Sequence, residues 1–148
     1  MHTLHFSIEI KAPVAKVCQL MLDDAGYRQW TAPFHPTSHF IGNWQTGSKM
    51  WFVAEEHGRQ QGMVSRIVAH IPQQHLYIEH IGILKEGTEI LQGADVEPWA
   101  GAREDYHFTV LPDGCRLDVQ LDSQQQWADF FQHTWPKALA ALKALAES

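Results

Sequence analysis

The sequence has few cysteines and no strongly apolar run, and each of these gaps excludes a class of protein. Among 148 residues only Cys18 and Cys115 are cysteines, far apart and in no metal or redox spacing. We therefore expect reduced thiols and no disulfide framework. No run approaches the roughly 18 apolar residues that a membrane-spanning helix needs, and the N-terminus has no signal-peptide pattern. We expect a cytoplasmic protein without membrane insertion.

Positive charge is also scarce. The chain carries 11 Lys and Arg against 17 Asp and Glu, and its formal net charge is −6 at pH 7. A surface with this balance disfavours phosphate backbones and anionic lipid, so we expect no nucleic-acid partner. The length of 148 residues suits one domain that buries a core without staples, and we expect a single domain over residues 1–148.

Motifs for metal binding and hydrolysis are absent as well. The ten histidines form no HExxH pattern, and Pro36 argues against a helix that would align His35 with His39. His75 and His107 fall on expected outer faces or turns. No G-x-S-x-G elbow is present. We therefore expect no metal, no cofactor and no recognisable catalytic residue.

The rest of the chain is organised around a helix predicted at its C-terminus. Apolar residues recur there at steps of three or four, which places them on one helical stripe: Trp127, Phe131, Trp135, Ala138, Leu142 and Leu145. Ser123 and Gln126 have the spacing of a capping box, which predicts that the helix begins at Ser123. Pro136 allows two interpretations, a kinked helix or a break after which Thr134 caps a second one. In both, the first half faces open space or bulky partners and the second is tightly packed.

Alternating apolar and polar residues predict seven β-strands before this helix. They cover residues 4–10, 39–44, 49–54, 62–71, 75–84, 103–111 and 115–122. Two short helices follow the first strand, one opened by Pro13 and one capped by Asp23 or Asp24. This order predicts an α+β fold, in which a curved antiparallel sheet of about seven strands surrounds the long C-terminal helix.

Two hairpins can be registered from the sequence. Asp113-Gly114 is typical of a two-residue type I′ turn, and it predicts these pairs on one face: Val110 with Leu117, Phe108 with Val119, and Tyr106 with Leu121. A turn at residues 72–74 predicts a second set of pairs: Ile71 with His75, Val68 with Ile78, and Arg66 with His80. Between the two hairpins lies a long irregular segment, residues 85–102, which contains Trp99 and is either a lid or a surface excursion.

The sequence resembles the START-like, helix-grip superfamily, also called SRPBCC, and within it the branch of the activator of the heat-shock-protein-90 ATPase homologue, C-terminal domain. The residues that carry the likeness are 8–17 (IEIKAPVAKV), 27–31 (YRQWT), 47–52, 62–64 with Pro72 and Leu76, 104–108 (EDYHF), and 135–139 (WPKAL) with Leu142 and Lys143. The likeness covers nearly the whole chain. It is specific for the fold and weak for function, because members bind lipids, hormones or polyketides, or act as cyclases.

The resemblance implies a deep, mostly apolar cavity between the sheet and the last helix. The alternative is that the aromatic residues of the helix and sheet fill the core. The residues expected to line the cavity are Trp30, Phe34, Val64, Arg66, Ile78, His80, Trp99, Glu104, Tyr106, Phe108, Trp127, Phe131 and Trp135. Among them Glu104, Arg66 and His80 would form a polar handle that orients an apolar ligand. In the alternative they form a structural ion pair, or Arg66 lies on the outer face.

Three functions are compatible with this pattern. We expect the cavity to bind a hydrophobic or aromatic small molecule. The first alternative is a cyclase- or aromatase-like enzyme that moves protons with Glu104, His80 or Arg66. The second, implied by the branch name, is a module that interacts with a chaperone. Chaperone activators of this branch carry a separate N-terminal domain as well, which we do not expect within these 148 residues.

Overall fold

An eight-stranded antiparallel sheet curves around one long helix. The computed structural model describes all residues, 1–148. The strands are β1 (His2–Ile10), β2 (His39–Ile41), β3 (Lys49–Glu56), β4 (Arg59–Ile71), β5 (His75–Lys85), β6 (Thr88–Ile90), β7 (Arg103–Leu111) and β8 (Gly114–Ser123). Their order in the sheet is β1-β8-β7-β5-β4-β3-β2, with β6 beside β5. The expected α+β class and helix-grip arrangement are confirmed. The strand beyond the expected seven is β6, which pairs with β5 inside the segment that we expected to be irregular.

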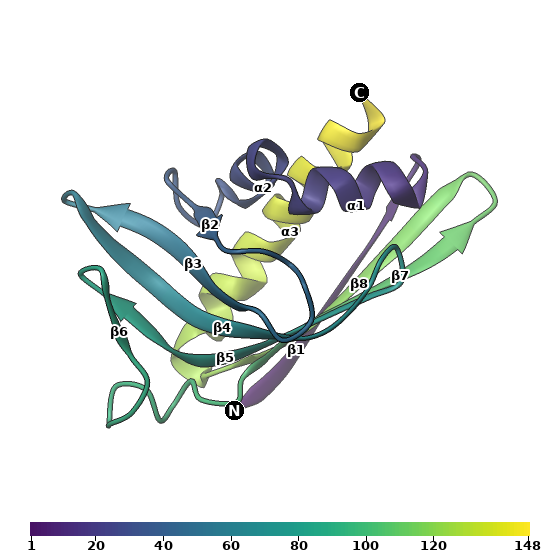
Figure 1. Cartoon of the computed structure of the whole chain (residues 1–148). Coiled ribbons are helices and arrows are strands. Elements are labelled where there is room, and N and C mark those ends of the chain that lie inside the picture. Colours follow the sequence, from purple (N-terminus) through teal and green to yellow (C-terminus); the bar gives the residue numbers. More distant parts are fainter.

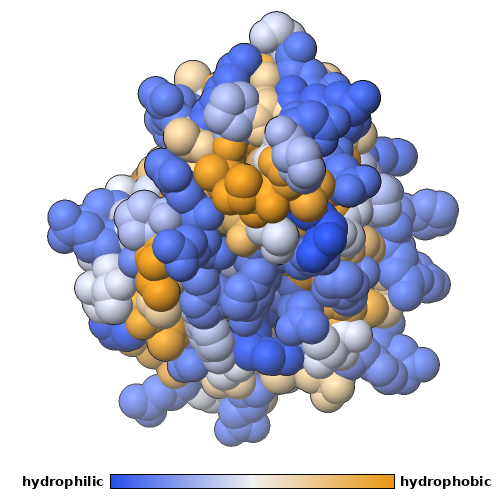
Figure 2. Space-filling model, turned by 90° about the vertical axis from the view of Figure 1, so that its right-hand side faces the viewer, coloured by the Kyte–Doolittle hydropathy of each residue, from blue (hydrophilic) through white to orange (hydrophobic).

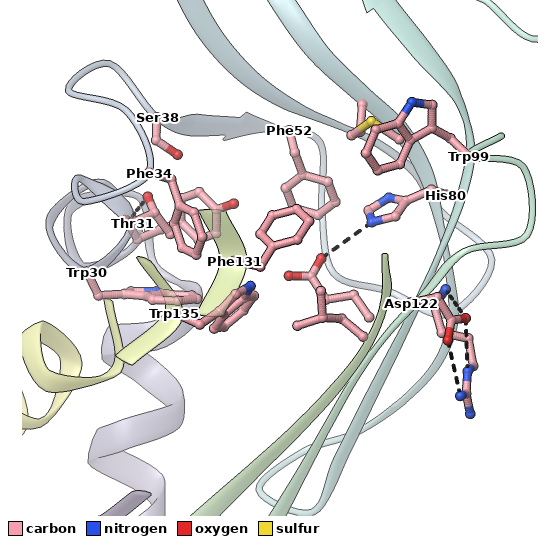
Figure 3. A pocket seen from close by; sticks show the side chains of 15 residues that line it. Trp30, Thr31, Phe34, Ser38, Phe52, His80, Trp99, Asp122, Phe131 and Trp135 are labelled. Atoms are coloured by element: carbon pink, nitrogen blue, oxygen red, sulfur yellow. Dashed lines mark hydrogen bonds and ion pairs between the residues drawn. The ribbon is translucent and has the colours of Figure 1, made fainter. Parts of the chain in front are cut away.

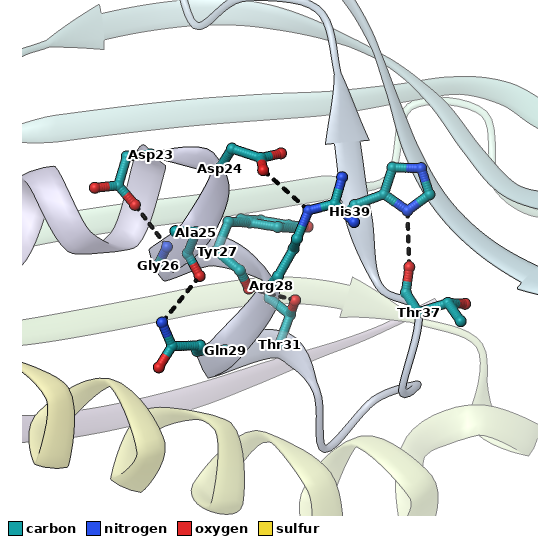
Figure 4. A network of polar contacts seen from close by, with 10 residues as sticks. All are labelled: Asp23, Asp24, Ala25, Gly26, Tyr27, Arg28, Gln29, Thr31, Thr37 and His39. Atoms are coloured by element: carbon teal, nitrogen blue, oxygen red, sulfur yellow. Dashed lines mark hydrogen bonds and ion pairs between the residues drawn. The ribbon is translucent and has the colours of Figure 1, made fainter.

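Two short helices follow β1, as the sequence predicts. They are α1 (Val14–Leu22) and α2 (Asp24–Thr31). The Asp23 carboxylate accepts a hydrogen bond of 2.6 Å from the backbone N–H of Gly26, so Asp23 is the N-cap of α2 (Figure 4). Both helices pack against the last helix (Figure 1). The cap therefore fixes where α2 begins, and with it the position of Trp30 and Thr31.

The last helix, α3 (Gln125–Glu147), is continuous and contains Pro136. It does not begin at Ser123 as the capping-box spacing predicts. Ser123 pairs with His2 in the β1–β8 ladder, so its backbone is extended, and its hydroxyl donates to the carbonyl of Gln124. The buried residues of α3 begin at Thr134, whereas Trp127 and Phe130 are 42% and 43% exposed. The residues after Pro136 are tightly packed as predicted, and Trp135, just before it, is buried among other aromatic rings.

The β7–β8 hairpin differs in register from the prediction. The turn is Pro112-Asp113, and Leu111 pairs with Gly114. The pairs are therefore Val110 with Cys115, Phe108 with Leu117, and Tyr106 with Val119. The prediction was wrong because Gly114 does not serve the turn: a Cβ there would collide with the carbonyl oxygen of Ile10 on β1. The error is two residues, which leaves every side chain on its predicted face.

The β4–β5 hairpin is partly as predicted. Ile71 faces His75, but Ile67 and not Val68 faces Ile78. A β-bulge at Val68 shifts the register by one residue from Ile67 to Ser65, and a second irregularity between Val64 and Ser65 restores it. The consequence for the other predicted pair is large, because Ser65 takes the place opposite His80 and Arg66 faces Glu79.

The face of the molecule drawn in Figure 2 is mostly hydrophilic. Figure 2 shows the face toward which the β7–β8 hairpin projects, where hydrophilic residues surround a compact hydrophobic patch. No helix of the structure combines the length and the hydropathy that crossing a membrane would require.

A candidate ligand cavity between the sheet and the last helix

A cavity of about 250 Å³ lies between the inner face of the sheet and the first half of α3. Its lining comes from α2, the loop that follows it, five strands, the segment before β7, and α3. The lining residues are Tyr27, Trp30, Thr31, Phe34, Ser38, Phe52, Met63, His80, Trp99, Arg103, Glu104, Leu121, Asp122, Phe131 and Trp135. The cavity lies where the exposed, aromatic half of α3 crosses the sheet.

Aromatic rings form one end of the cavity. The indole N–H of Trp30 donates to the carbonyl of Met21 at 2.9 Å, which fixes the ring beneath α2. The Trp135 ring lies 5.9 Å from that of Trp30 and 5.1 Å from that of Phe34, which it meets edge-on. These contacts fix the positions of the three rings at this end of the cavity. In Figure 3, Trp30, Phe34 and Trp135 lie at one end of the cavity and His80 and Trp99 at the other.

The second end of the cavity contains a small polar cluster. The Tyr106 hydroxyl donates to Glu104 Oε1 at 2.6 Å. The other carboxyl oxygen, Oε2, lies 3.8 Å from Nε2 of His80, and Nδ1 of His80 lies 2.7 Å from Ser65 Oγ. Ser65 is fully buried. The cluster thus presents one carboxyl and one imidazole to the cavity, each held by a hydroxyl behind it.

Burial favours the neutral form of both groups. Desolvation lowers the pKa of His80 from 6.5 to about 4, so its imidazole is neutral at pH 7. Desolvation also raises the pKa of Glu104, against the hydrogen bond from Tyr106, which lowers it. The pKa values of Tyr27 and Tyr106 are raised by burial as well. A site of neutral donors and acceptors suits an uncharged ligand.

The opening of the cavity is bordered by the segment before β7 and by α3. The rings of Trp99 and Trp127 lie 6.3 Å apart. The segment is tied to β5 by two backbone hydrogen bonds of 2.9 Å, from His80 N–H to the Ala102 carbonyl and from Gly101 N–H to the His80 carbonyl. Arg103 also lies at this end, with its side chain paired to Asp122. Trp99 is therefore held at the opening by a segment whose end is fixed.

The structure brings several of the expected lining residues together: Trp30, Phe34, His80, Trp99, Glu104, Phe131 and Trp135. Others lie nearby without reaching the cavity. Tyr106 and Ile78 are buried below Glu104, Phe108 packs against the core, and Trp127 lies outside on α3. None of these four residues forms the wall of the cavity.

Two of the expected lining residues point the other way. Arg66 is exposed on the outer face, where its guanidinium donates to the Gly47 carbonyl at 3.0 Å. The inward placement of Arg66 was wrong because the bulge at Val68 changes the pairing. Val64 lies in a small separate cluster with Val53 and Leu84. The polar handle of the cavity therefore has no arginine, and Ser65 stands opposite His80 in its place.

Sequence reasoning missed part of the lining. Phe52 and Met63 are a cross-strand pair of β3 and β4, and they were missed because the expected inward placement of Val64 and Arg66 puts Met63 on the opposite face. Tyr27, Thr31 and Ser38 reach the cavity only because α2 and its loop fold over the sheet. No periodic pattern marks such positions.

The cavity offers few ligands for a metal. Its acidic and imidazole groups are His80, Glu104 and Asp122, and the last is engaged by Arg103. Two remaining groups fall short of the three protein ligands that a catalytic zinc site uses. The chemistry available here is hydrogen bonding to a ligand, and exchange of a proton between a ligand and His80 or Glu104.

No protein-family model and no curated protein sequence matches the chain. Solved structures do. The Aha1 dimer from Colwellia psychrerythraea is similar with a TM-score of 0.70 at 20% identity, over 99% of this chain and 97% of that one. Protein MLL2253 from Mesorhizobium loti has a TM-score of 0.73 at 13% identity, over 97% and 96%. DynU16, from the dynemicin biosynthetic locus, has a TM-score of 0.70 at 15% identity, over 99% of this chain and 47% of that one.

At these identities the TM-scores establish the fold alone. The chain has a helix-grip fold, the architecture also found in the Aha1 protein from Colwellia psychrerythraea.

Proposed function

We propose that this protein binds an uncharged, largely aromatic small molecule between the sheet and α3. The observation that carries the proposal is the cavity itself, with aromatic rings at one end and, at the other, the neutral His80 imidazole and the buried Glu104 carboxyl, whose pKa is raised by desolvation. Pockets for small molecules are apolar hollows with a few convergent polar groups, usually of about 300–1,000 Å³. The volume of about 250 Å³ favours a ligand of one or two rings.

The polar end defines the chemistry of the ligand further. The one lining cation, Arg103, is paired with Asp122, so an anionic ligand would find no free partner. A hydroxyl or carbonyl can exchange a hydrogen bond with the Glu104 carboxyl. The proposed ligand is therefore an aromatic ring system that bears one such group.

Calorimetric titration with 2-naphthol and naphthalene tests this proposal, because the two probes differ by one hydroxyl. We expect one molecule of 2-naphthol to bind per chain, about 2- to 10-fold more tightly than naphthalene, which is the contribution of one hydrogen bond. Glu104→Leu should remove this preference. Glu79→Leu is the matched control, because Glu79 faces Arg66 on the outer side of the sheet. Absence of binding by both probes would overturn the proposal.

A second candidate function is acid–base catalysis in the same cavity. It is favoured by the neutral His80 imidazole, whose Nε2 lies 3.8 Å from the Glu104 carboxyl. Such a pair can remove a proton next to a ligand carbonyl and return it. The exchange of hydrogen for deuterium in 2-tetralone, followed by NMR, tests this candidate. Exchange no faster with the wild type than with His80→Gln would rule it out and leave the binding proposal intact.

A further inference from the structure

Three potential metal ligands meet on the face of the sheet opposite the cavity. His75 of β5 and His107 of β7 are directly opposite each other, and Asp105 lies two residues before His107 on the same face. Asp105 Oδ1 is 2.6 Å from His75 Nε2 and 3.4 Å from His107 Nε2. The three ligand atoms all lie within 4.8 Å of one another.

The carboxylate of this cluster forms no ion pair with a permanent cation, because Arg103, which it attracts only at longer range, is paired with Asp122. The Asp105 side chain is only 10% exposed, and its ion-pair partners are the two imidazoles, with no lysine or arginine. A carboxylate buried to this degree is normally paired with a full positive charge or coordinated to a metal. A divalent cation between the three side chains would supply that charge.

The three ligand atoms can reach the spacing of a small transition-metal ion by small side-chain movements. Zinc binds imidazole nitrogen and carboxylate oxygen at about 2.0–2.2 Å, and tetrahedral geometry then puts the ligand atoms roughly 3.3–3.5 Å apart. The separation between His107 and Asp105 already has this value, and that between His75 and Asp105 must widen. The two rings are stacked, with centroids 4.2 Å apart and planes 12° apart, so one ring must turn to direct its lone pair at the ion. His107 is free to do so because its side chain is 53% exposed.

We propose that His75, Asp105 and His107 form a site for zinc, or a divalent ion of similar chemistry, on the outer face of the sheet. Two imidazole nitrogens and one carboxylate oxygen are a donor set that suits zinc. Three protein ligands leave a fourth position, and the exposure of His107 opens it to solvent. The site is independent of the cavity, because strands β5 and β7 separate the two.

Titration of the chelator-treated protein with zinc sulfate, followed by calorimetry, tests the proposal. We expect one equivalent to bind. Loss of a residue that only hydrogen-bonds to a metal ligand weakens metal binding by roughly 10- to 100-fold. His107→Ala and Asp105→Asn each change a ligand itself, so we expect each to weaken zinc binding by more than this. His107→Ala removes a half-exposed ring, and its thermal unfolding verifies that it folds. The same protein with Co²⁺ should show the strong visible absorption of a four-coordinate ion.

His5→Ala is the matched control. His5 lies on the same face, contacts Asp118 and is also 53% exposed, but it does not belong to the cluster. We expect His5→Ala to bind zinc as the wild type does. Failure of the wild type to bind one equivalent would overturn the proposal. So would an equal loss of affinity in His5→Ala and His107→Ala, because adventitious binding by surface histidines would then account for the signal.

Discussion

At the scale of single residues, the buried His80 and Glu104 each make the stability of the protein depend on pH. Burial lowers the pKa of His80 and raises that of Glu104, so each neutral form is favoured in the folded chain. The signs of their effects on stability are opposite. Acidification destabilises the fold through His80, whereas a rise in pH destabilises it through Glu104.

The pKa of His80 predicts a loss of stability in acid. The unfolded imidazole takes up a proton near pH 6.5 and the folded one only near 4, so stability is lost as the pH falls through this window. The shift corresponds to a loss of about 3 kcal/mol by the acid end of the window. Denaturant unfolding of Glu104→Gln and of Glu104→Gln/His80→Gln between pH 7.5 and pH 4 isolates the effect. Equal pH dependence of the two proteins would contradict the account.

Glu104→Gln should stabilise the protein at neutral and alkaline pH. Because the pKa of Glu104 is raised in the folded protein, the carboxyl of the unfolded chain loses its proton at a lower pH. The stability that the protonated carboxyl contributes in acid is therefore lost as the pH rises through the folded-state pKa. Glutamine has no proton to lose and keeps an oxygen for the Tyr106 hydroxyl. We expect the variant to melt higher than the wild type at pH 8 and equally near pH 4. A lower melting temperature at pH 8 would mean that the folded protein needs the carboxylate.

At the scale of secondary-structure elements, periodicity predicts the helices and most strands, and local exceptions decide the rest. Val68 is apolar like its neighbours, and nothing in the sequence marks it as a bulge. Because of this bulge, Ser65 and not Arg66 lies opposite His80 at the polar end of the cavity. Ser123 satisfies a capping pattern, but pairing with His2 in the sheet overrides it. Long-range pairing, which no short motif encodes, explains both errors.

Replacing Pro136 by alanine should stabilise α3. Pro136 lies inside the helix and is exposed, so the substitution restores a backbone hydrogen bond to Gln132 and removes little packing. We expect a gain of about 1–3 kcal/mol in the free energy of unfolding. Denaturant titration measures it, with Ala140→Gly as an exposed control in the same helix that should be destabilised by about 1 kcal/mol. A loss of stability in Pro136→Ala would contradict this prediction and show that the proline itself stabilises the fold.

Gly114→Ala should be more harmful than a glycine substitution in a turn. The new Cβ would collide with the Ile10 carbonyl and force β1 away from β8, at a cost of about 3 kcal/mol or more. Gly58→Ala is the comparison, because Gly58 has a φ of +76° in the β3–β4 turn and open space around it. Its cost should be about 1 kcal/mol, from the left-handed backbone alone. A lower melting temperature for Gly58→Ala than for Gly114→Ala would contradict this prediction.

At the scale of the whole molecule, the cavity follows from how α3 crosses the sheet. The second half of α3 is packed by Ala138, Leu139 and Leu142, while the first half carries Phe131 over the cavity. The aromatic stripe of the helix and the inward parity of Glu104 are legible in the sequence. The closure of α2 over the sheet and the meeting of His75 with His107 are not, because each joins residues from separate elements.

The central claim is that the space between the sheet and α3 accepts a guest. Xenon enters apolar protein cavities and requires no knowledge of the natural ligand. A crystal structure under xenon pressure should show a xenon atom among Trp30, Phe34, Phe131 and Trp135. Ser38→Trp, which places a large ring in the cavity from a loop, should abolish the peak. A wild-type crystal without xenon there, in which side chains fill the space, would contradict the account.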